Sequence, residues 1–312
     1  MNFLLETLNV TGPIFVIIML GLVLQRTGLI TESFLQVSSK LVFSICLPIL
    51  LFTTIVKLDL SETFNLKAVV FTLFATFVIF GISWLVSLFT QPREDRGVVT
   101  QGCFRSNLGV IGIALAANAY GDHGLAVASL LMASLTIAFN VLSVVVLSYY
   151  QSQQRPQAKQ LALEVLRNPL IIAIVVAAIL AGFSVPVPGV LLSAGGYLGS
   201  MALPLALLGT GAGLSLRALR QSGASTLLVV AMKTLILPSI VVGMALVSGF
   251  RGVELGVIFL LFVAPTATVS YAMVRAMGGN DVLTANLISA TTIVSIATCS
   301  LGLVLLKSLS LA

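Results

Sequence analysis

Long apolar runs separated by short polar connections make up almost the whole chain. Cutting the sequence at glycine, proline and charge clusters leaves ten runs of about 17–27 residues, each long enough to cross a bilayer as a helix. They cover residues 10–26, 35–57, 67–90, 97–119, 124–150, 168–184, 190–214, 224–249, 253–277 and 282–307. The runs are apolar throughout and do not alternate with a period of two, which disfavours a β-barrel. The pattern predicts an all-α polytopic membrane protein with ten transmembrane helices.

The composition narrows the class of protein further. Of the 312 residues, 58% are hydrophobic and 8% are charged, and the mean hydropathy is +1.14. A soluble domain carries about 25% charged residues, so a soluble enzyme domain, a disordered chain and a nucleic-acid-binding chain are excluded. The expected surroundings are a lipid bilayer.

The sequence contains no pattern typical of a catalytic or cofactor site. Three cysteines, Cys46, Cys103 and Cys299, lie inside apolar runs and indicate neither a disulfide framework nor a metal site. No Walker loop, CxxC pair, HExxH or nucleophile elbow occurs. The single histidine, His123, is expected in the connection after the fourth run. We therefore expect no enzyme, no metal and no cofactor.

The positions of lysine and arginine predict the orientation of the spans. Alternate connections carry ten basic residues on one side and four on the other. The first side holds Arg26, Lys40, Arg93, Arg96, Arg155, Lys159, Arg167, Arg217, Arg220 and Arg275; the second holds Lys57, Lys67, Arg251 and Lys307. Because positive charge marks the cytoplasmic side, we expect a protein of the inner (plasma) membrane with both termini outside, in the periplasm. The first run then reads as a retained span and not as a signal peptide.

Matching features divide the chain into two halves. A polar linker at 151–167 separates residues 1–150 from residues 168–312, with five predicted spans in each half. Pro13 and Pro169 are 156 residues apart, and so are Pro48 and Pro204, which is half of 312. The turns after the fourth and ninth spans, at 120–122 and 278–280, are 158 residues apart. An odd number of spans per half inverts the second half, so the sequence predicts the inverted-repeat plan of secondary transporters.

The fourth and ninth spans are irregular at corresponding positions. Span 4 contains Arg105, Ser106, Asn107 and Gly109 within a few residues, and span 9 contains Pro265, Thr266, Thr268 and Ser270. With the offset of 158, Asn107 falls opposite Pro265. We expect both helices to break and cross near the midplane, where their free backbone groups line a substrate site. The alternative is that these small residues serve close packing only. Pro48, Pro204 and Pro238 are expected to be kinks or hinges.

Two basic residues lie deep in the membrane without an acidic partner. All ten acidic residues occupy connections or span ends, whereas Arg105 and Lys233 lie about 13–15 Å from the cytoplasmic end at about 1.5 Å rise per residue. A cation in lipid costs about 3 kcal/mol or more, so the missing counter-ion is expected to be the cargo, a small organic anion. Two alternatives stay open: Arg105 caps the carbonyls of a broken helix, and Lys233 snorkels or is neutral.

The lack of buried acids also limits the means of coupling. A carboxylate proton relay or a carboxylate-based sodium site needs Asp or Glu at depth. Sodium held by carbonyls and by side chains such as Asn107, Thr266 and Asn140 stays open.

The residues from Cys103 to Gly112, CFRSNLGVIG, resemble the fourth-span signature of the auxin efflux carrier family. Gly12-Pro13-Ile14-Phe15, Leu47-Pro48 and Ala264-Pro265-Thr266-Ala267 are also similar to that family. The resemblance implies ten spans in two inverted five-helix repeats, crossing at helices 4 and 9 as in bile-acid symporters and sodium–proton antiporters. It also implies elevator-type alternating access, with a scaffold of spans 1, 2, 6 and 7 that often forms homodimers. One departure is that many members have a proline after this signature, where this chain has residues 113–116, IALA.

The leading hypothesis is a secondary transporter for a small organic anion, such as a dicarboxylate or an auxin-like weak acid. The substrate site would use Arg105, Ser106, Asn107, Gly109, Asn140, Lys233, Pro265, Thr266, Thr268 and Ser270. The nearest alternative is a sodium-coupled symporter of the bile-acid type, which replacement of sodium by choline distinguishes. A second alternative is a non-transporting membrane sensor or assembly subunit, whose sign would be a soluble signalling domain.

Overall fold

The computed structural model describes residues 2–57, 65–90, 92–151, 167–214 and 223–312. Within these ranges all regular elements are helices, apart from one isolated antiparallel bridge between Ser106 and Thr266. Six helical segments are long and apolar enough to cross a membrane: Glu32–Ile55, Leu66–Ser87, Leu108–Tyr150, Gly189–Ala212, Ala224–Val247 and Asp281–Ser308. Three shorter apolar helices are Thr11–Arg26, Pro169–Gly182 and Gly252–Val263. The prediction of an all-helical, multi-pass membrane protein is confirmed at this level.

In the first half the helices follow the predicted runs closely. They are α1 (Asn2–Arg26), α2 (Glu32–Leu41), the π-helix η1 (Val42–Cys46), α3 (Leu47–Ile55), α5 (Leu66–Ser87), α6 (Asp95–Phe104), the π-helix η2 (Leu108–Gly112) and α7 (Ile113–Tyr150). Gly121 interrupts α7 with φ 62° and ψ −152°, a conformation that favours glycine. This residue separates the fourth predicted span from the fifth, and His123 is exposed just after it, within α7.

The second half contains the same kinds of element. They are α9 (Pro169–Gly182), α10 (Gly189–Ser200), α11 (Ala202–Ala212), α13 (Ala224–Ala231), the π-helix η3 (Met232–Ile236), α14 (Leu237–Val247), α15 (Gly252–Val263), α16 (Val269–Ala276) and α17 (Asp281–Ser308). Extended residues separate α6 from η2 and α15 from α16. Both predicted irregular spans are therefore broken helices.

Each of the three prolines expected at kinks accompanies a helix irregularity. Proline lacks an amide hydrogen, and its ring clashes with the carbonyl four residues earlier. The wide π-turns η1 and η3 come directly before Leu47-Pro48 and Leu237-Pro238, where they relieve that clash. Pro204 lies in the first turn of α11, just after the interruption at Met201. A hinge motion at these positions stays a prediction.

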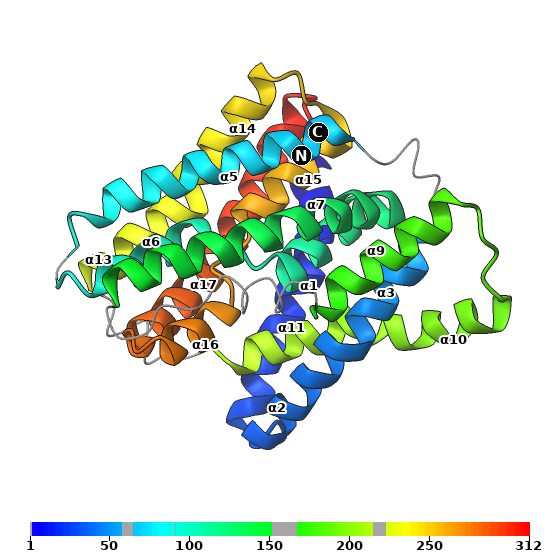
Figure 1. Ribbon diagram of the computed structural model, residues 1–312, viewed down its shortest axis with the longest axis horizontal. Coiled ribbons are helices and arrows are strands. Elements are labelled where there is room, and N and C mark those ends of the chain that lie inside the picture. The colour runs from blue at the N-terminus through cyan, green and yellow to red at the C-terminus, as the bar shows by residue number, and fades with distance from the viewer. Residues whose placement is uncertain (1, 58–64, 91, 152–166, 215–222) are drawn as a thin grey trace.

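One group of helices is joined by very close backbone approaches. α1 packs mainly against α11, and α3 packs against α9 and α10. The helices α3, α9 and α10 lie together at one side of the molecule (Figure 1). A Cβ atom added to Gly211 of α11 would collide with the Ile18 carbonyl of α1, and one added to Gly21 would collide with the Leu208 carbonyl. Small residues that let backbones touch are typical of helix packing in membranes.

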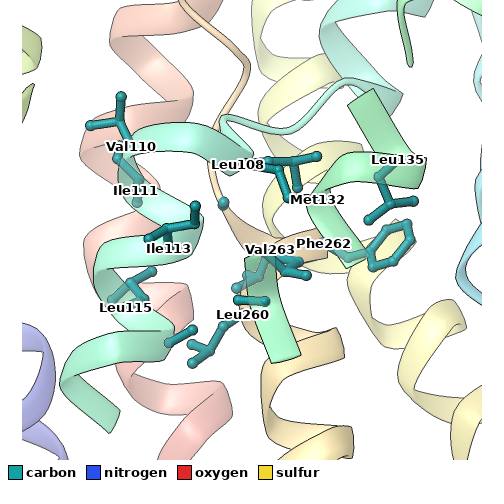
Figure 2. Close-up of a cluster of buried hydrophobic side chains, with 14 of the residues drawn as sticks. Leu108, Val110, Ile111, Ile113, Leu115, Met132, Leu135, Leu260, Phe262 and Val263 are labelled. Carbon is teal, nitrogen blue, oxygen red and sulfur yellow. The ribbon is translucent and has the colours of Figure 1, made fainter. Parts of the chain in front are cut away.

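The helices around the two breaks form the most deeply buried part of the molecule. α5, α6 and α7 pack on one another, α15 packs on α7, and α17 packs against α13 and α15. The core here is apolar, with Leu108, Ile111 and Leu115 from η2 and α7, and Leu260, Phe262 and Val263 from α15 (Figure 2). The polar groups of the crossing are thus surrounded by hydrocarbon and have to be satisfied within the protein.

The contact between α1 and α11 predicts a marked effect of one methyl group. Gly211→Ala should lower the free energy of unfolding by about 1–3 kcal/mol, because the new Cβ has no space against the Ile18 carbonyl. The matched control is Gly209→Ala on the same helix, where an added Cβ meets nothing within 4 Å. Thermal unfolding of the detergent-solubilised protein measures both variants, and equal midpoints would contradict the packing described for α11.

Candidate functional site

The two broken helices cross through a short antiparallel backbone pairing. Arg105 leaves the helical conformation after α6, with φ −83° and ψ 106°, and Ala264 does so after α15, with φ −51° and ψ 140°. Between them the Asn107 amide donates to the Pro265 carbonyl at 2.8 Å, and the Ala267 amide donates to the Arg105 carbonyl at 3.1 Å. Each segment therefore supplies the backbone partners that the other lost when its helix ended.

The sequence explains why α15 ends where it does. Pro265 has no amide to continue the helix, and it disfavours the helical conformation at the preceding residue, Ala264. Span 4 has no such proline. Its chain leaves the helix at Arg105–Asn107 and resumes as the π-helix η2, in which the Gly112 amide donates to the Asn107 carbonyl at 3.0 Å. The break in span 4 therefore forms without a proline in the segment 103–116.

Hydroxyl groups cap the two interrupted helices in matching ways. The Thr266 hydroxyl donates to the Gly102 carbonyl at 2.8 Å, and the Ser106 hydroxyl donates to the Phe262 carbonyl at 3.4 Å. Carbonyls in the last turn of a helix lack a partner within it, so each cap satisfies the end of the opposite helix. The four residues form two pairs whose numbers differ by 160, Ser106 with Thr266 and Gly102 with Phe262.

This pairing corrects one detail of the sequence interpretation. The offset of 158, measured at the turns, made Asn107 the counterpart of Pro265. In the structure the bridge joins Ser106 to Thr266, so the counterpart of Asn107 is Ala267 and that of Arg105 is Pro265. The offset differs because the helical stretch between the crossing and the following turn differs in length between the halves.

Arg105 is buried, with 4% of its surface exposed, and all its hydrogen-bond partners are neutral. Its guanidinium donates to the Asn140 side-chain oxygen at 2.6 Å, to the Ser143 hydroxyl at 2.9 Å and to the Met273 sulfur at 2.8 Å. Asn140 and Ser143 are three residues apart on α7, so they present their polar atoms on one face. Within the described part of the chain no carboxylate pairs with this charge.

A cavity of about 250 Å³ lies beside this arginine. Six of the predicted site residues line it: Arg105, Ser106, Asn107, Gly109, Asn140 and Thr268. The other four, Lys233, Pro265, Thr266 and Ser270, are not in its lining; Thr266 and Pro265 belong to the crossing behind it. Pro48, Pro204 and Pro238 do not line it either. A Cβ on Gly109 would meet nothing nearer than 3.8 Å, so the glycine leaves this wall of the cavity open.

The cavity also includes residues that the sequence interpretation did not assign to the site. Asn168, Pro169 and Leu170 bring the N-terminus of α9 to it, and the Asn168 side-chain oxygen accepts from the Leu170 amide at 2.9 Å. The apolar side is formed by Phe43, Met132, Phe139 and Leu170. An asparagine followed by a proline is a sequence signal for the start of a helix, and Asn168-Pro169 fits it. That signal does not indicate that the start of α9 lies beside Arg105, which depends on the tertiary structure.

Two buried polar groups near the crossing have no hydrogen-bond partner among the described residues. They are the side-chain NH₂ of Asn107 and the hydroxyl of Ser270. An unsatisfied buried donor costs about 1–3 kcal/mol, so such groups are typical of a site that gains a ligand or changes conformation. Asn107 also lines the cavity.

A second, larger cavity of about 720 Å³ lies next to the first. It separates α2 and α11 from α16 and α17, and Phe43 and Thr268 line both cavities. Its lining extends to Glu32 at the start of α2, on the side predicted to be cytoplasmic. The larger cavity thus leads from that side towards the space beside Arg105.

The described residues contain no group of three His, Cys, Asp or Glu side chains that could hold a metal ion. Cys46, Cys103 and Cys299 are buried and unbonded.

The sequence of this chain is similar to known membrane transporters over nearly its whole length. The sequence model of a family described as "Membrane transport protein" matches residues 11–303, which include both helix breaks and both cavities. A protein of Methanothermobacter thermautotrophicus described as an uncharacterized transporter is 27% identical over 300 residues, or 94% of this chain and 96% of the relative.

The capping of α6 by Thr266 predicts a measurable loss of stability. Thr266→Val keeps the shape of the side chain but leaves the Gly102 carbonyl unsatisfied, so the free energy of unfolding should fall by about 1–3 kcal/mol. The matched control is Thr76→Val in α5, whose equally buried hydroxyl bonds only within its own helix, to the Thr72 carbonyl. Thermal unfolding in detergent compares the two, and Thr266→Ser should stay close to the wild type. A Thr266→Val variant no less stable than Thr76→Val would refute this role.

Proposed function

The chain belongs to the membrane transport protein family, the family of the auxin efflux carriers, and from that premise we propose that it is a secondary carrier for a small organic anion. The cargo is a dicarboxylate or an auxin-like weak acid, and it crosses the membrane by alternating access. The observation that carries this proposal is the guanidinium of Arg105, which is buried, held by neutral groups and placed in the wall of a cavity.

Arg105 and the neighbouring helix ends favour an anion in that cavity. A buried charge without a partner is costly, so a bound carboxylate stabilises the site by supplying the missing charge. Arginine binds a carboxylate through two parallel hydrogen bonds. The cavity also borders the N-termini of α9 and of α16, at Thr268 and Val269, where the helix dipole favours negative charge.

The size and lining of the cavity limit the cargo. Cavities that hold drug-sized ligands span about 300–1,000 Å³, so about 250 Å³ suits an acid of few heavy atoms. An apolar wall of the same cavity is formed by Phe43, Met132 and Phe139. An anion with a small carbon skeleton would place its carboxylate on Arg105 and its carbon atoms against this wall.

The proposed architecture is ten spans in two inverted repeats, residues 1–150 and 168–312, joined by the cytoplasmic linker 151–167. The matched caps at an offset of 160 residues support this repeat, since each half contributes the same bonds to the crossing. The basic residues in alternate connections support an inner-membrane protein with both termini in the periplasm. A homodimer formed through the scaffold is part of the proposal.

Alternating access would occur at the boundary between two groups of helices. The cavity beside Arg105 is lined by η1 and α9 and also by the crossing, η2, α7 and α16. We assign η1 and α9 to the scaffold, together with α1, α3, α10 and α11, and the crossing to the moving group. The larger cavity between α11 and α16 then corresponds to access from the cytoplasmic side. A bound anion neutralises Arg105, so the moving group crosses the apolar barrier without an uncompensated charge.

Uptake by proteoliposomes tests the proposal. Labelled malonate, malate and indole acetate should enter liposomes that contain the wild-type protein. Arg105→Gln should reduce uptake of the transported acid by about 10-fold to 100-fold, because a charge-assisted hydrogen bond contributes about 1.5–3 kcal/mol. Arg275→Gln is the matched control, since Arg275 is exposed near the end of α16 and its guanidinium bonds, within the described part of the chain, to the Tyr271 hydroxyl.

Two results would overturn the proposal. Unchanged uptake by Arg105→Gln would remove Arg105 from the anion site. No uptake of any organic acid by folded wild-type protein would favour the non-transporting sensor. A sodium-coupled symporter of the bile-acid type is the alternative within transport, and it would need a cation site of its own.

A further inference from the structure

The second deep cation, Lys233, is bound to the helix crossing and lies outside both cavities. Its side chain is 1% exposed. The ammonium donates to the Ser106 hydroxyl at 2.5 Å and to the Phe262 carbonyl at 2.9 Å. Ser106 belongs to the segment after α6 and Phe262 to the last turn of α15, so one cation joins both broken helices. Its charge therefore acts on the crossing and not directly on a molecule in either cavity.

The end of α15 is a place where a cation is expected. The carbonyls at the C-terminus of a helix carry a partial negative charge equivalent to about half an elementary charge. In secondary transporters with broken helices, such C-terminal ends and unwound carbonyls coordinate the coupling sodium ion or proton. The Phe262 carbonyl and the Ser106 hydroxyl are oxygen ligands of the kind that a monovalent metal ion takes, and here both accept from Lys233.

Among the described residues no carboxylate bonds to Lys233, and its two hydrogen-bond acceptors, a hydroxyl and a carbonyl, are neutral. Lys233 also lies in the π-turn η3, and π-turns inside helices are frequent at functional sites. This turn directs a four-carbon stem from η3 to the crossing between α6 and α15.

We propose that the Lys233 ammonium is a built-in substitute for a bound monovalent cation at the helix crossing, so that the crossing assembles without sodium. Because the charge is covalently attached, no free ion has to bind before the segments pair. This inference depends on the proposed transport function only in the experiment that measures anion uptake. Its structural consequence, a cation position that the lysine fills, is independent of transport.

Chemical rescue of a shortened side chain tests the cation position. Lys233→Ala removes three methylene groups and the ammonium, a fragment that n-propylammonium reproduces. The unfolding midpoint of this variant in detergent should lie several degrees below that of the wild type. Propylammonium at about ten times its dissociation constant should raise the midpoint by about 2–4 °C, and sodium should also raise it, whereas choline, which is too bulky, should not.

Two controls separate the charge from the space it occupies. Lys233→Met fills the same volume without a charge and should not respond to any of the three cations. Met232→Ala opens a space in the same π-turn but keeps Lys233, and it should not respond either. A Lys233→Ala protein that is folded and equally indifferent to propylammonium, sodium and choline would overturn the inference. So would an equal response of Met232→Ala.

A further test of the same inference uses the wild-type protein and compares sodium with choline. Its unfolding midpoint and its anion uptake should be the same in sodium chloride and in choline chloride of equal ionic strength. A sodium-specific rise in either quantity would overturn the inference, because the crossing would then use a free cation. If propylammonium rescues Lys233→Ala but the wild type carries no anion, the cation position stands and the proposed function fails.

Discussion

Backbone groups freed at the ends of two broken helices are the constraint on which the rest of the structure depends. They lie in a mostly apolar part of the protein, where each unsatisfied group costs several kcal/mol. The two segments satisfy each other through the Asn107–Pro265 and Ala267–Arg105 hydrogen bonds, and through the caps from Thr266 and Ser106. The breaks are therefore stable only as a pair.

The same constraint gives the two buried cations different tasks. Lys233 donates to the Phe262 carbonyl and so belongs to the set of groups that satisfy the crossing. Arg105 bonds to the side chains of Asn140 and Ser143, and its charge borders a cavity. The Lys233 ammonium is bound by groups of the protein itself, whereas the Arg105 guanidinium is available to a ligand in the cavity. The N-terminal ends of α9 and α16, where the helix dipole is positive, line the same cavity as Arg105.

The amino-acid pattern alone predicts the helices and the break at Pro265, because apolar length and a proline act locally. The break in span 4 is predicted from the polar and glycine residues between Arg105 and Gly109. It also predicts that Arg105 lacks an acidic partner, since the acids lie at the span ends. It does not predict that Lys233 turns away from the cavity, because depth in a span says nothing about which neighbour a side chain meets. The offset of 160 residues between the paired groups of the crossing depends on the lengths of the helices in each half. The position of Asn168 beside the cavity depends on tertiary packing. Neither can be derived from single sequence positions.

A structure of the protein determined in saturating malonate, or in whichever acid it carries, tests the central claim most directly. The account predicts density for a carboxylate within hydrogen-bonding distance of the Arg105 guanidinium, in the cavity bounded by Gly109 and Asn168, with Lys233 still bound to the Phe262 carbonyl. Anion density at another position, or an anion bound to Lys233 while the space beside Arg105 stays empty, would contradict it.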